Sequence, residues 1–121
     1  MKKIEELSNK IEYLGKILSR TKSGLIFMAD RLQKQGLEEQ AKLLYSEIAT
    51  IDLDLAQYIK KFGGDYFPEG LSAVSCYTLC GNYKKARELC NELIKEDFPK
   101  KYKKELSKTL KWIDKKEADN T

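Results

Sequence analysis

Three cysteines are the side chains of this sequence best suited to bind a metal or to act as nucleophiles. Cys76 and Cys80 are four positions apart, which places them on one face of a predicted helix, and Cys90 follows on the next. A closed zinc site requires four ligands, and the sequence offers no histidine and no fourth cysteine. We therefore interpret the cysteines as small core residues and expect no metal and no cofactor. An exposed thiol acting as a redox sensor is the alternative.

A row of lysines near the C-terminus is the second group with chemical potential. Residues 99–121 contain eight lysines and four acidic residues, so the whole net charge of +4 lies in this segment. Such a helix attracts phosphates or an acidic partner, and aromatic residues beside it offer stacking. The candidate binding residues are Tyr77, Lys100, Lys101, Lys103, Lys104, Lys108, Lys111 and Trp112. The segment contains no arginine, which binds phosphate in bidentate fashion, so we interpret it first as the solvent-exposed face of a terminal helix.

The other residue types give no indication of an active site. Without histidine, the chain lacks the commonest general base and cannot form a Ser-His or Cys-His nucleophile. Gly63-Gly64-Asp65 follows a predicted helix and is not succeeded by the Gly-Lys-Ser/Thr of a phosphate loop. Paired acids such as Glu38/Glu39 and Asp52/Asp54 are expected in first helical turns or on polar faces. We therefore expect a protein that is not an enzyme.

Helices must position these side chains, because apolar residues recur every three or four positions and no strand pattern occurs. The predicted fold class is all-α, with about five helices arranged as antiparallel hairpins in a single domain. We expect an N-terminal helix over 1–22, a first hairpin over 23–62, a loop over 63–70, a second hairpin over 71–98 and a basic C-terminal capping helix over 99–117. The residues after this last helix should fray.

The first apolar series has the spacing of a coiled-coil seam. Its members are Ile4, Leu7, Ile11, Leu14, Leu18, Leu25, Met28 and Leu32. Gly24 weakens the helix and Ser23 can cap a new one, so we expect a break or kink at 21–24. The seam packs either on the second helix of its own chain or on another copy. Its flanking residues carry no opposite charges for self-pairing, and a homodimer through the N-terminal helix stays the alternative.

A second apolar series predicts one helix of roughly 25 residues, which is about twice the usual length. Its members are Leu37, Ala41, Leu44, Ile48, Ile51, Leu55, Tyr58 and Phe62. Pro68 can occupy the first turn of a third helix, where its missing N–H does no harm, and Asn82 is a suitable cap for a fourth. Along the last two helices the residues expected to face the core are Tyr83, Ala86, Cys90, Leu93, Ile94, Tyr102, Leu106, Leu110 and Ile113.

One short pattern occurs twice, 45 residues apart. Gly36, Ala41 and Tyr45 have the same spacing as Gly81, Ala86 and Cys90. A glycine followed by a new helix predicts a tight corner, and the alanine then lies where the two helices approach most closely.

The segment from Gly81 through Tyr83, Ala86 and Cys90 to Pro99 resembles the second half of a tetratricopeptide repeat, and Tyr77 matches the aromatic of the preceding helix. The first copy is similar through a complementary set of positions, Leu25, Met28, Ala29, Ala41 and Tyr45. The resemblance implies a right-handed stack that presents a grooved surface to a peptide or a partner protein. Positions at which many members clamp a C-terminal carboxylate with Lys and Asn are occupied by Ile26, Asp30, Leu71 and Ser75.

The sequence therefore predicts a protein- or peptide-binding adaptor. The alternative is an accessory protein that binds nucleic acid or an acidic partner through the C-terminal lysines. No apolar run approaches the ~20 residues needed to cross a bilayer, so no membrane partner is expected. The odd number of cysteines is untypical of a secreted disulfide scaffold, and we expect a cytoplasmic protein.

Overall fold

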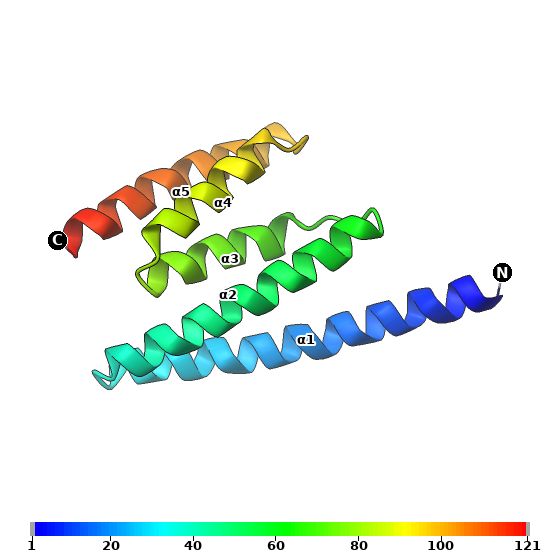
Figure 1. Ribbon diagram of the computed structural model, residues 1–121, viewed down its shortest axis with the longest axis horizontal. Helices are drawn as coiled ribbons and strands as arrows, with labels where there is room; N and C mark the ends of the chain where they lie inside the picture. Colours follow the sequence, from blue (N-terminus) through cyan, green and yellow to red (C-terminus); the bar gives the residue numbers. More distant parts are fainter. Residues whose placement is uncertain (1, 121) are drawn as a thin grey trace.

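The computed structural model describes residues 2–120 as five α-helices, and no strand occurs among them. They are α1 (Lys2–Lys34), α2 (Glu38–Lys61), α3 (Phe67–Leu79), α4 (Tyr83–Lys95) and α5 (Lys100–Asp119) (Figure 1). The predicted all-α class with five helices is confirmed. Met1 and Thr121 lie outside the described residues, as do the side chains of Lys2, Ile4, Leu7, Ser8, Lys10, Ile11, Glu12, Leu14, Leu18 and Ser19. The predicted seam positions Ile4, Leu7, Ile11, Leu14 and Leu18 are therefore outside the described side chains.

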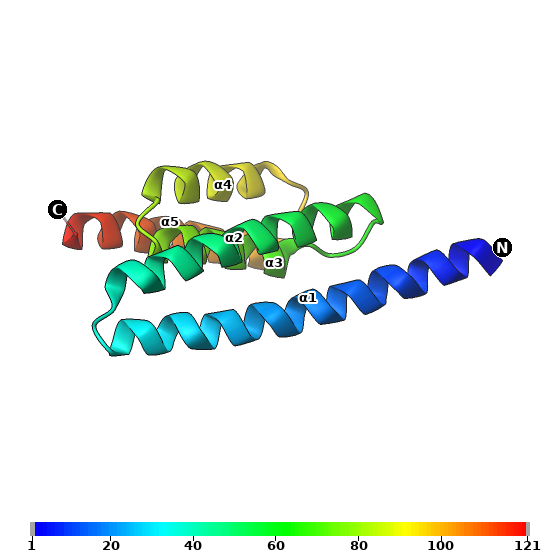
Figure 2. The same cartoon turned by 60° about the horizontal axis from the view of Figure 1, so that its bottom comes forward.

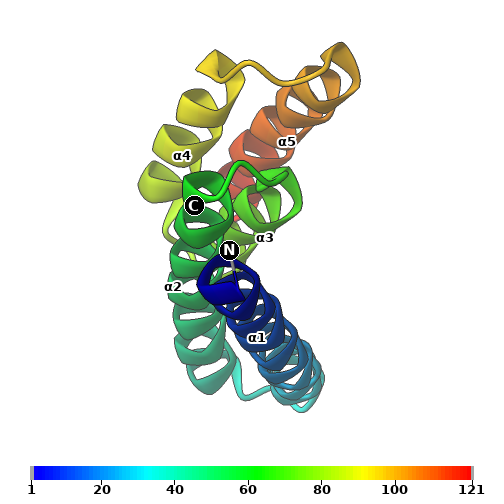
Figure 3. The ribbon, with the colours of Figure 1, turned by 90° about the vertical axis from the view of Figure 1, so that its right-hand side faces the viewer.

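Each helix packs against the next one in the sequence, and α3 also contacts α5. Within the described chain, α1 contacts α2 and no other helix. As a result α1 lies at one edge of the molecule and α5 at the opposite side (Figures 1 and 3). The N-terminal end of α1 extends past the end of α2, as Figure 2 shows. The first hairpin therefore has one side that no other helix covers.

Glycines in the left-handed region end the first three helices. Gly36, Gly63 and Gly81 have φ angles of 81°, 76° and 85°. The amide after each glycine donates to a carbonyl five residues earlier, as from Leu37 to Leu32 (2.9 Å) and from Asn82 to Tyr77 (2.8 Å). This is the Schellman motif, which only glycine enters without a steric penalty. Both predicted corners are confirmed, and Ala41 and Ala86 after them are buried.

Of the break or kink predicted at 21–24, the break is wrong, because α1 runs through these residues without interruption. The hydroxyl of Thr21 donates to the carbonyl of Ile17 (3.0 Å) and so stays within the helix. The ammonium of Lys22 lies 3.0 Å from Oδ1 of the buried Asp52 and holds this turn against α2. Tertiary contact therefore outweighs the weak local propensity around Gly24.

The predicted loop over 63–70 is too long, since α3 begins at Phe67 instead of 71. Oδ1 of Asp65 accepts a hydrogen bond from the amide of Phe67 (3.1 Å), and Pro68 occupies the first turn. Gly70 is buried against Leu93, where an added Cβ would lie 3.1 Å from the leucine methyl carbons. The close approach of α3 and α4 therefore draws this segment into the helix.

Several predicted seam residues are exposed. Met28 is 53% exposed and its neighbour Ala29 is buried in its place, because a period of 3.6 shifts the stripe by one position over this length. Tyr58 on α2 and Phe62 directly after α2 are about half exposed, and so is Leu37 directly before α2. α1 and α2 diverge from their connecting turn in Figure 1, so that α1 does not follow α2 to its C-terminal end.

The later helices bury the residues that the sequence predicts. Ala86, Cys90, Leu93, Leu106 and Ile113 are buried, and Tyr83, Ile94, Tyr102 and Leu110 pack partly buried against them. The ring of Phe67 stacks on that of Tyr102, with centroids 3.9 Å apart. The predicted end of the last helix at 117 is too early, because Arg87 pairs with Asp114 and Glu117 (2.9 Å each) and α5 is helical to Asp119. The last residue of the segment expected to fray, Thr121, lies outside the described residues.

Candidate interaction surfaces

Large hydrophobic side chains are exposed only on the first hairpin and at its two ends, among the described residues. They are Tyr13, Ile17, Phe27, Met28, Leu37, Leu43, Tyr58 and Phe62, with exposed fractions between 41% and 69%. The described parts of α3, α4 and α5 expose none of comparable size. Clustered apolar exposure on a small protein is typical of an interaction surface.

Two stripes of exposed residues organise this surface. On α1 the stripe steps by four and three, and on α2 a second stripe steps in the same way, which places each set on one face of its helix. We call the two stripes together the hairpin face; its members are Tyr13, Ile17, Arg20, Gly24, Phe27 and Arg31 on α1 and Leu43, Glu47, Thr50, Asp54 and Tyr58 on α2. All eleven residues are exposed.

Each stripe lies on the outer side of its own helix. Lys22 and Asp52 pair with each other close to Cys76 of α3, so their side chains mark the packed sides of α1 and α2. Arg20 and Gly24 are two positions from Lys22, and Thr50 and Asp54 are two positions from Asp52. Two positions correspond to about 200° around a helix of 3.6 residues per turn. The α1 stripe is therefore turned away from α2, which is the helix that α1 contacts, and the α2 stripe is turned away from the buried side of α2.

The lysines of α5 form a second surface, on the opposite side of the molecule. Five of them step by four, four, three and four positions along one exposed face of the helix; this lysine ridge consists of Lys100, Lys104, Lys108, Lys111 and Lys115. The core-facing residues Leu106 and Ile113 lie on the other side of α5. Within the described chain, no member of the ridge forms an ion pair. The ridge is a line of uncompensated positive charge.

The other predicted binding residues lie beside the ridge or away from it. Lys101 is exposed next to the ridge, three positions before Lys104, with its ammonium 5.2 Å from the centroid of the Tyr102 ring. Lys103 is exposed on a different side of α5. Trp112 is half-buried against the core. Tyr77 is buried on α3, and the ammonium of Lys85 lies 5.3 Å from its ring centroid. Tyr77 therefore contributes packing to the core and offers no open surface.

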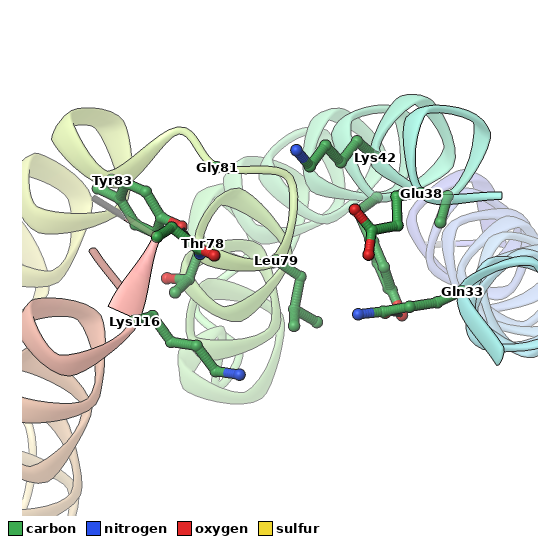
Figure 4. Close-up of a pocket in the computed structure, with 11 residues that line it drawn as sticks. Gln33, Glu38, Lys42, Thr78, Leu79, Gly81, Tyr83 and Lys116 are labelled. Carbon is green, nitrogen blue, oxygen red and sulfur yellow. Dashed lines mark hydrogen bonds between the residues drawn. The ribbon is translucent and has the colours of Figure 1, made fainter. Parts of the chain in front are cut away.

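A small polar pocket lies where the corners at Gly36 and Gly81 meet the end of α5. Its volume is about 160 Å³, below the ~300 Å³ at which ligand sites usually begin. Figure 4 shows Lys42 and Glu38 on one side and Lys116 on the other, around Thr78 and Leu79 at the end of α3. The pocket therefore has room for a few waters and is too small for a typical ligand.

A buried charge lies at the centre of the first hairpin. Asp52 is fully buried, and neither of its carboxylate oxygens accepts a well-aligned hydrogen bond from the described residues. Its compensation is the ammonium of Lys22 at 3.0 Å. The expectation that Asp52 lies on a polar face is therefore wrong, whereas Asp54 is exposed. Asp52 lies four positions after Ile48 and three before Leu55. This placement on the apolar stripe was the sequence signal that Asp52 is buried.

The cysteines pack in the interior. Burial raises the pKa of the Cys76 thiol to about 12, with the nearby Asp52 carboxylate adding to the effect, and burial raises the pKa of the Cys90 thiol to about 11. The Cys90 thiol donates to the carbonyl of Leu106 (3.4 Å), and the half-buried Cys80 thiol donates to that of Tyr77 (3.2 Å). The described residues contain no group of three potential ligands for a metal ion.

No protein-family model matches the chain, and neither does any curated protein or solved structure. Between residues 2 and 120, no helix combines the length and the apolar character that crossing a membrane requires. The candidate surfaces therefore rest on the geometry of this chain alone.

Sequence reasoning missed the hairpin face. It sorted the apolar residues of each helix into one seam and left Tyr13, Ile17, Phe27 and Leu43 unassigned. Tyr13, Ile17 and Phe27 are separated by four and ten positions, which places them on one face of α1. This spacing was the signal that α1 has a second apolar stripe. A helix with two apolar stripes buries one of them inside its own hairpin and leaves the other exposed.

Proposed function

We propose that this chain is a non-enzymatic adaptor of tetratricopeptide-like type that binds a protein or a peptide in the cytoplasm. The observation that carries the proposal is the concentration of exposed hydrophobic side chains on the first hairpin. Apolar side chains rimmed by charged ones, as Phe27 is flanked by Arg31, are typical of the centre of a protein interface. The repeated glycine corners at Gly36 and Gly81 support the tetratricopeptide-like description.

Capture from a cell lysate tests this proposal. The immobilised wild-type protein is expected to retain a specific protein, and Phe27→Ser with Leu43→Ser is expected to abolish that retention. Lys103→Glu is the matched control, because it changes an exposed residue on another side of the molecule. If no specific protein is retained and the purified chain turns over a small molecule, the adaptor proposal is wrong.

The lysine ridge favours a second candidate, an accessory protein that binds nucleic acid or an acidic partner through α5. Five aligned lysines between positions 100 and 115 provide a positive field along about 22 Å of the helix. Binding of this kind weakens steeply with salt, because each neutralised phosphate releases a counterion.

The ridge candidate is tested by Lys104→Glu with Lys108→Glu, compared with Lys84→Glu with Lys103→Glu, two exposed positions outside the ridge. Both double variants change the net charge equally. We expect affinity for DNA, RNA or an acidic protein to fall much further in the ridge variant, and the steepest salt dependence to identify the partner class. Equal losses in both variants would reduce the effect to net charge and would reject a ridge-specific site.

A further inference from the structure

The α1 stripe has the spacing of a second coiled-coil seam. Its six members, from Tyr13 to Arg31, follow one another by four, three, four, three and four positions. This alternation has a period of 3.5 residues, which is the repeat that keeps one side of a helix against another helix along its length. The stripe is turned away from α2, and α1 contacts no other helix of the described chain. It is therefore an uncovered seam about 27 Å long, at 1.5 Å per residue.

The residue types of this seam are those found where two proteins meet. Tyr13, Ile17 and Phe27 are 66%, 41% and 68% exposed. Aromatic residues and arginine are enriched in protein interfaces, whereas lysine and glutamate are depleted there. The stripe contains two aromatic residues and two arginines, and no lysine or acidic residue. Its composition therefore indicates a partner helix and not a solvated helix face.

Gly24 occupies the middle of the seam. No atom of the described residues lies within 4 Å of a Cβ added at this position, so the packing of the chain itself does not require a glycine. Glycine is also less favourable than alanine inside a helix. In a coiled coil, each seam side chain fits between side chains of the facing helix. The missing side chain at Gly24 therefore leaves space for a large apolar side chain of the partner.

The two arginines of the seam determine the charge of the partner. Arg20 and Arg31 are exposed, as is Lys34 one turn later, and none of the three forms an ion pair with another described residue. The only acidic residue between positions 13 and 34 is Asp30, which accepts a hydrogen bond from the Tyr45 hydroxyl of α2. An arginine covered by a second helix requires a carboxylate opposite it, because an unpaired buried charge is strongly destabilising.

We propose that the α1 stripe binds an amphipathic helix that carries acidic residues within its apolar seam. The partner has one carboxylate opposite Arg20 and another opposite Arg31, eleven positions apart, and a large apolar side chain opposite Gly24. Its other seam positions are apolar. This inference rests on the proposed function, because it specifies the protein partner of the adaptor.

Two synthetic helical peptides test the charge of the partner. The first has glutamate at two seam positions eleven residues apart and leucine at the other seam positions, four and seven residues after the first glutamate among them. The second has lysine in place of both glutamates. This pattern is the same in either chain direction, so it fits a parallel and an antiparallel helix. Isothermal titration calorimetry with the whole chain is expected to show micromolar binding of the glutamate peptide and at least ~10-fold weaker binding of the lysine peptide. Equal affinities, or no binding of either peptide, would overturn the proposal.

Charge reversal in the chain should exchange the two peptides. Arg20→Glu/Arg31→Glu is expected to lower the affinity for the glutamate peptide at least ~10-fold and to raise that for the lysine peptide. The control Lys104→Glu/Lys108→Glu makes the same change in net charge on the lysine ridge and should keep the preference for glutamate. The same loss of preference in both variants would reduce the effect to net charge and would reject the seam.

Two matched pairs of substitutions test the apolar part of the seam. Phe27→Ser is expected to weaken binding of the glutamate peptide at least ~10-fold, whereas Phe62→Ser removes an equally exposed ring outside the seam and should not. Gly24→Ala and Gly15→Ala should both raise the midpoint of urea unfolding, but only Gly24→Ala should weaken binding. Phe27→Ser binding as tightly as the wild type would contradict a helix on this side of α1.

The outcomes separate the acidic helix from the adaptor function. A mass above the 14.0 kDa of one chain in sedimentation equilibrium without peptide, lost on Phe27→Ser, would identify a second copy on the stripe and overturn the acidic helix. If neither peptide binds and the wild type still retains a lysate protein that Phe27→Ser/Leu43→Ser loses, the adaptor stands and the acidic helix is rejected. Circular dichroism of every variant checks that a loss of binding is not a loss of fold.

Discussion

Replacing Lys22 by methionine removes the ammonium that compensates a fully buried carboxylate while keeping the length of the side chain. Asp52 is inaccessible to solvent and lacks well-aligned hydrogen bonds from the described residues, and the Lys22 side chain is 17% exposed. Breaking a buried pair by removing one partner typically costs about 3–5 kcal/mol. Because water reaches the ammonium, we expect Lys22→Met near the lower end of this range, about 3 kcal/mol.

The reverse change should cost less. Asp52→Leu leaves Lys22, whose partly exposed ammonium can extend toward solvent. The double variant Lys22→Met/Asp52→Leu replaces the pair by apolar side chains of similar volume, which is often neutral or stabilising by about 1–4 kcal/mol. The expected order of destabilisation is therefore Lys22→Met, then Asp52→Leu, then the double variant.

Urea unfolding at neutral pH, followed by far-UV circular dichroism, gives the free energy of unfolding for all four proteins. The total free energy of unfolding of a single domain is typically about 5–15 kcal/mol, so the expected differences are measurable. If Lys22→Met costs less than about 1 kcal/mol, the carboxylate is solvated and α1 does not cover it. A double variant as unstable as Lys22→Met would show that the loss is one of packing and not of charge.

Three further predictions concern the turns and the thiols. Gly36→Ala and Gly81→Ala should each lower the free energy of unfolding by about 1–2 kcal/mol, because the left-handed conformation destabilises an L-residue by about this amount. The control Gly15→Ala within α1 should raise the free energy of unfolding. Equal effects at all three positions would contradict the assigned turns. Raising the pH from 9 toward 11 should destabilise the fold, because burial raises the pKa of Cys76 and Cys90 above the unfolded value of 9.0 and the folded chain therefore holds more protons in this range. The unfolding midpoint measured as a function of pH tests this, with Cys76→Ala/Cys90→Ala as the control. A midpoint of the wild type that does not change with pH would refute it. Pulsed alkylation with mass spectrometry should label the half-buried Cys80 before the buried Cys76 and Cys90, and earlier labelling of Cys90 would contradict its burial.

Local chemistry explains why the corners could be predicted from the sequence. Gly36 and Gly81 are followed by helix-starting residues, and a positive φ at a helix end is almost a property of glycine alone. Asn82 as the cap of α4 is equally local, because its side chain accepts from the amide of Lys85 (3.3 Å). These features need no knowledge of the rest of the fold.

Long-range contacts account for what the sequence could not show. The continuity of α1 at 21–24 depends on Asp52, thirty positions away, and the helical start at Phe67 depends on contact of Gly70 with Leu93. Tyr77 has a sequence position compatible with a binding role, yet α3 is enclosed by α2, α4 and α5 and buries it. Such competition between local propensity and tertiary packing is resolved only in the folded chain.

Whether the exposed hydrophobic side chains of the first hairpin bind a partner is decided most directly by capture from a lysate with three immobilised proteins. They are the wild type, the double variant Phe27→Ser/Leu43→Ser and the control Lys103→Glu. The wild type and the control are expected to retain the same specific protein, and the double variant is expected to lose it while keeping its helical circular dichroism spectrum. Equal retention by all three proteins would contradict binding through the first hairpin.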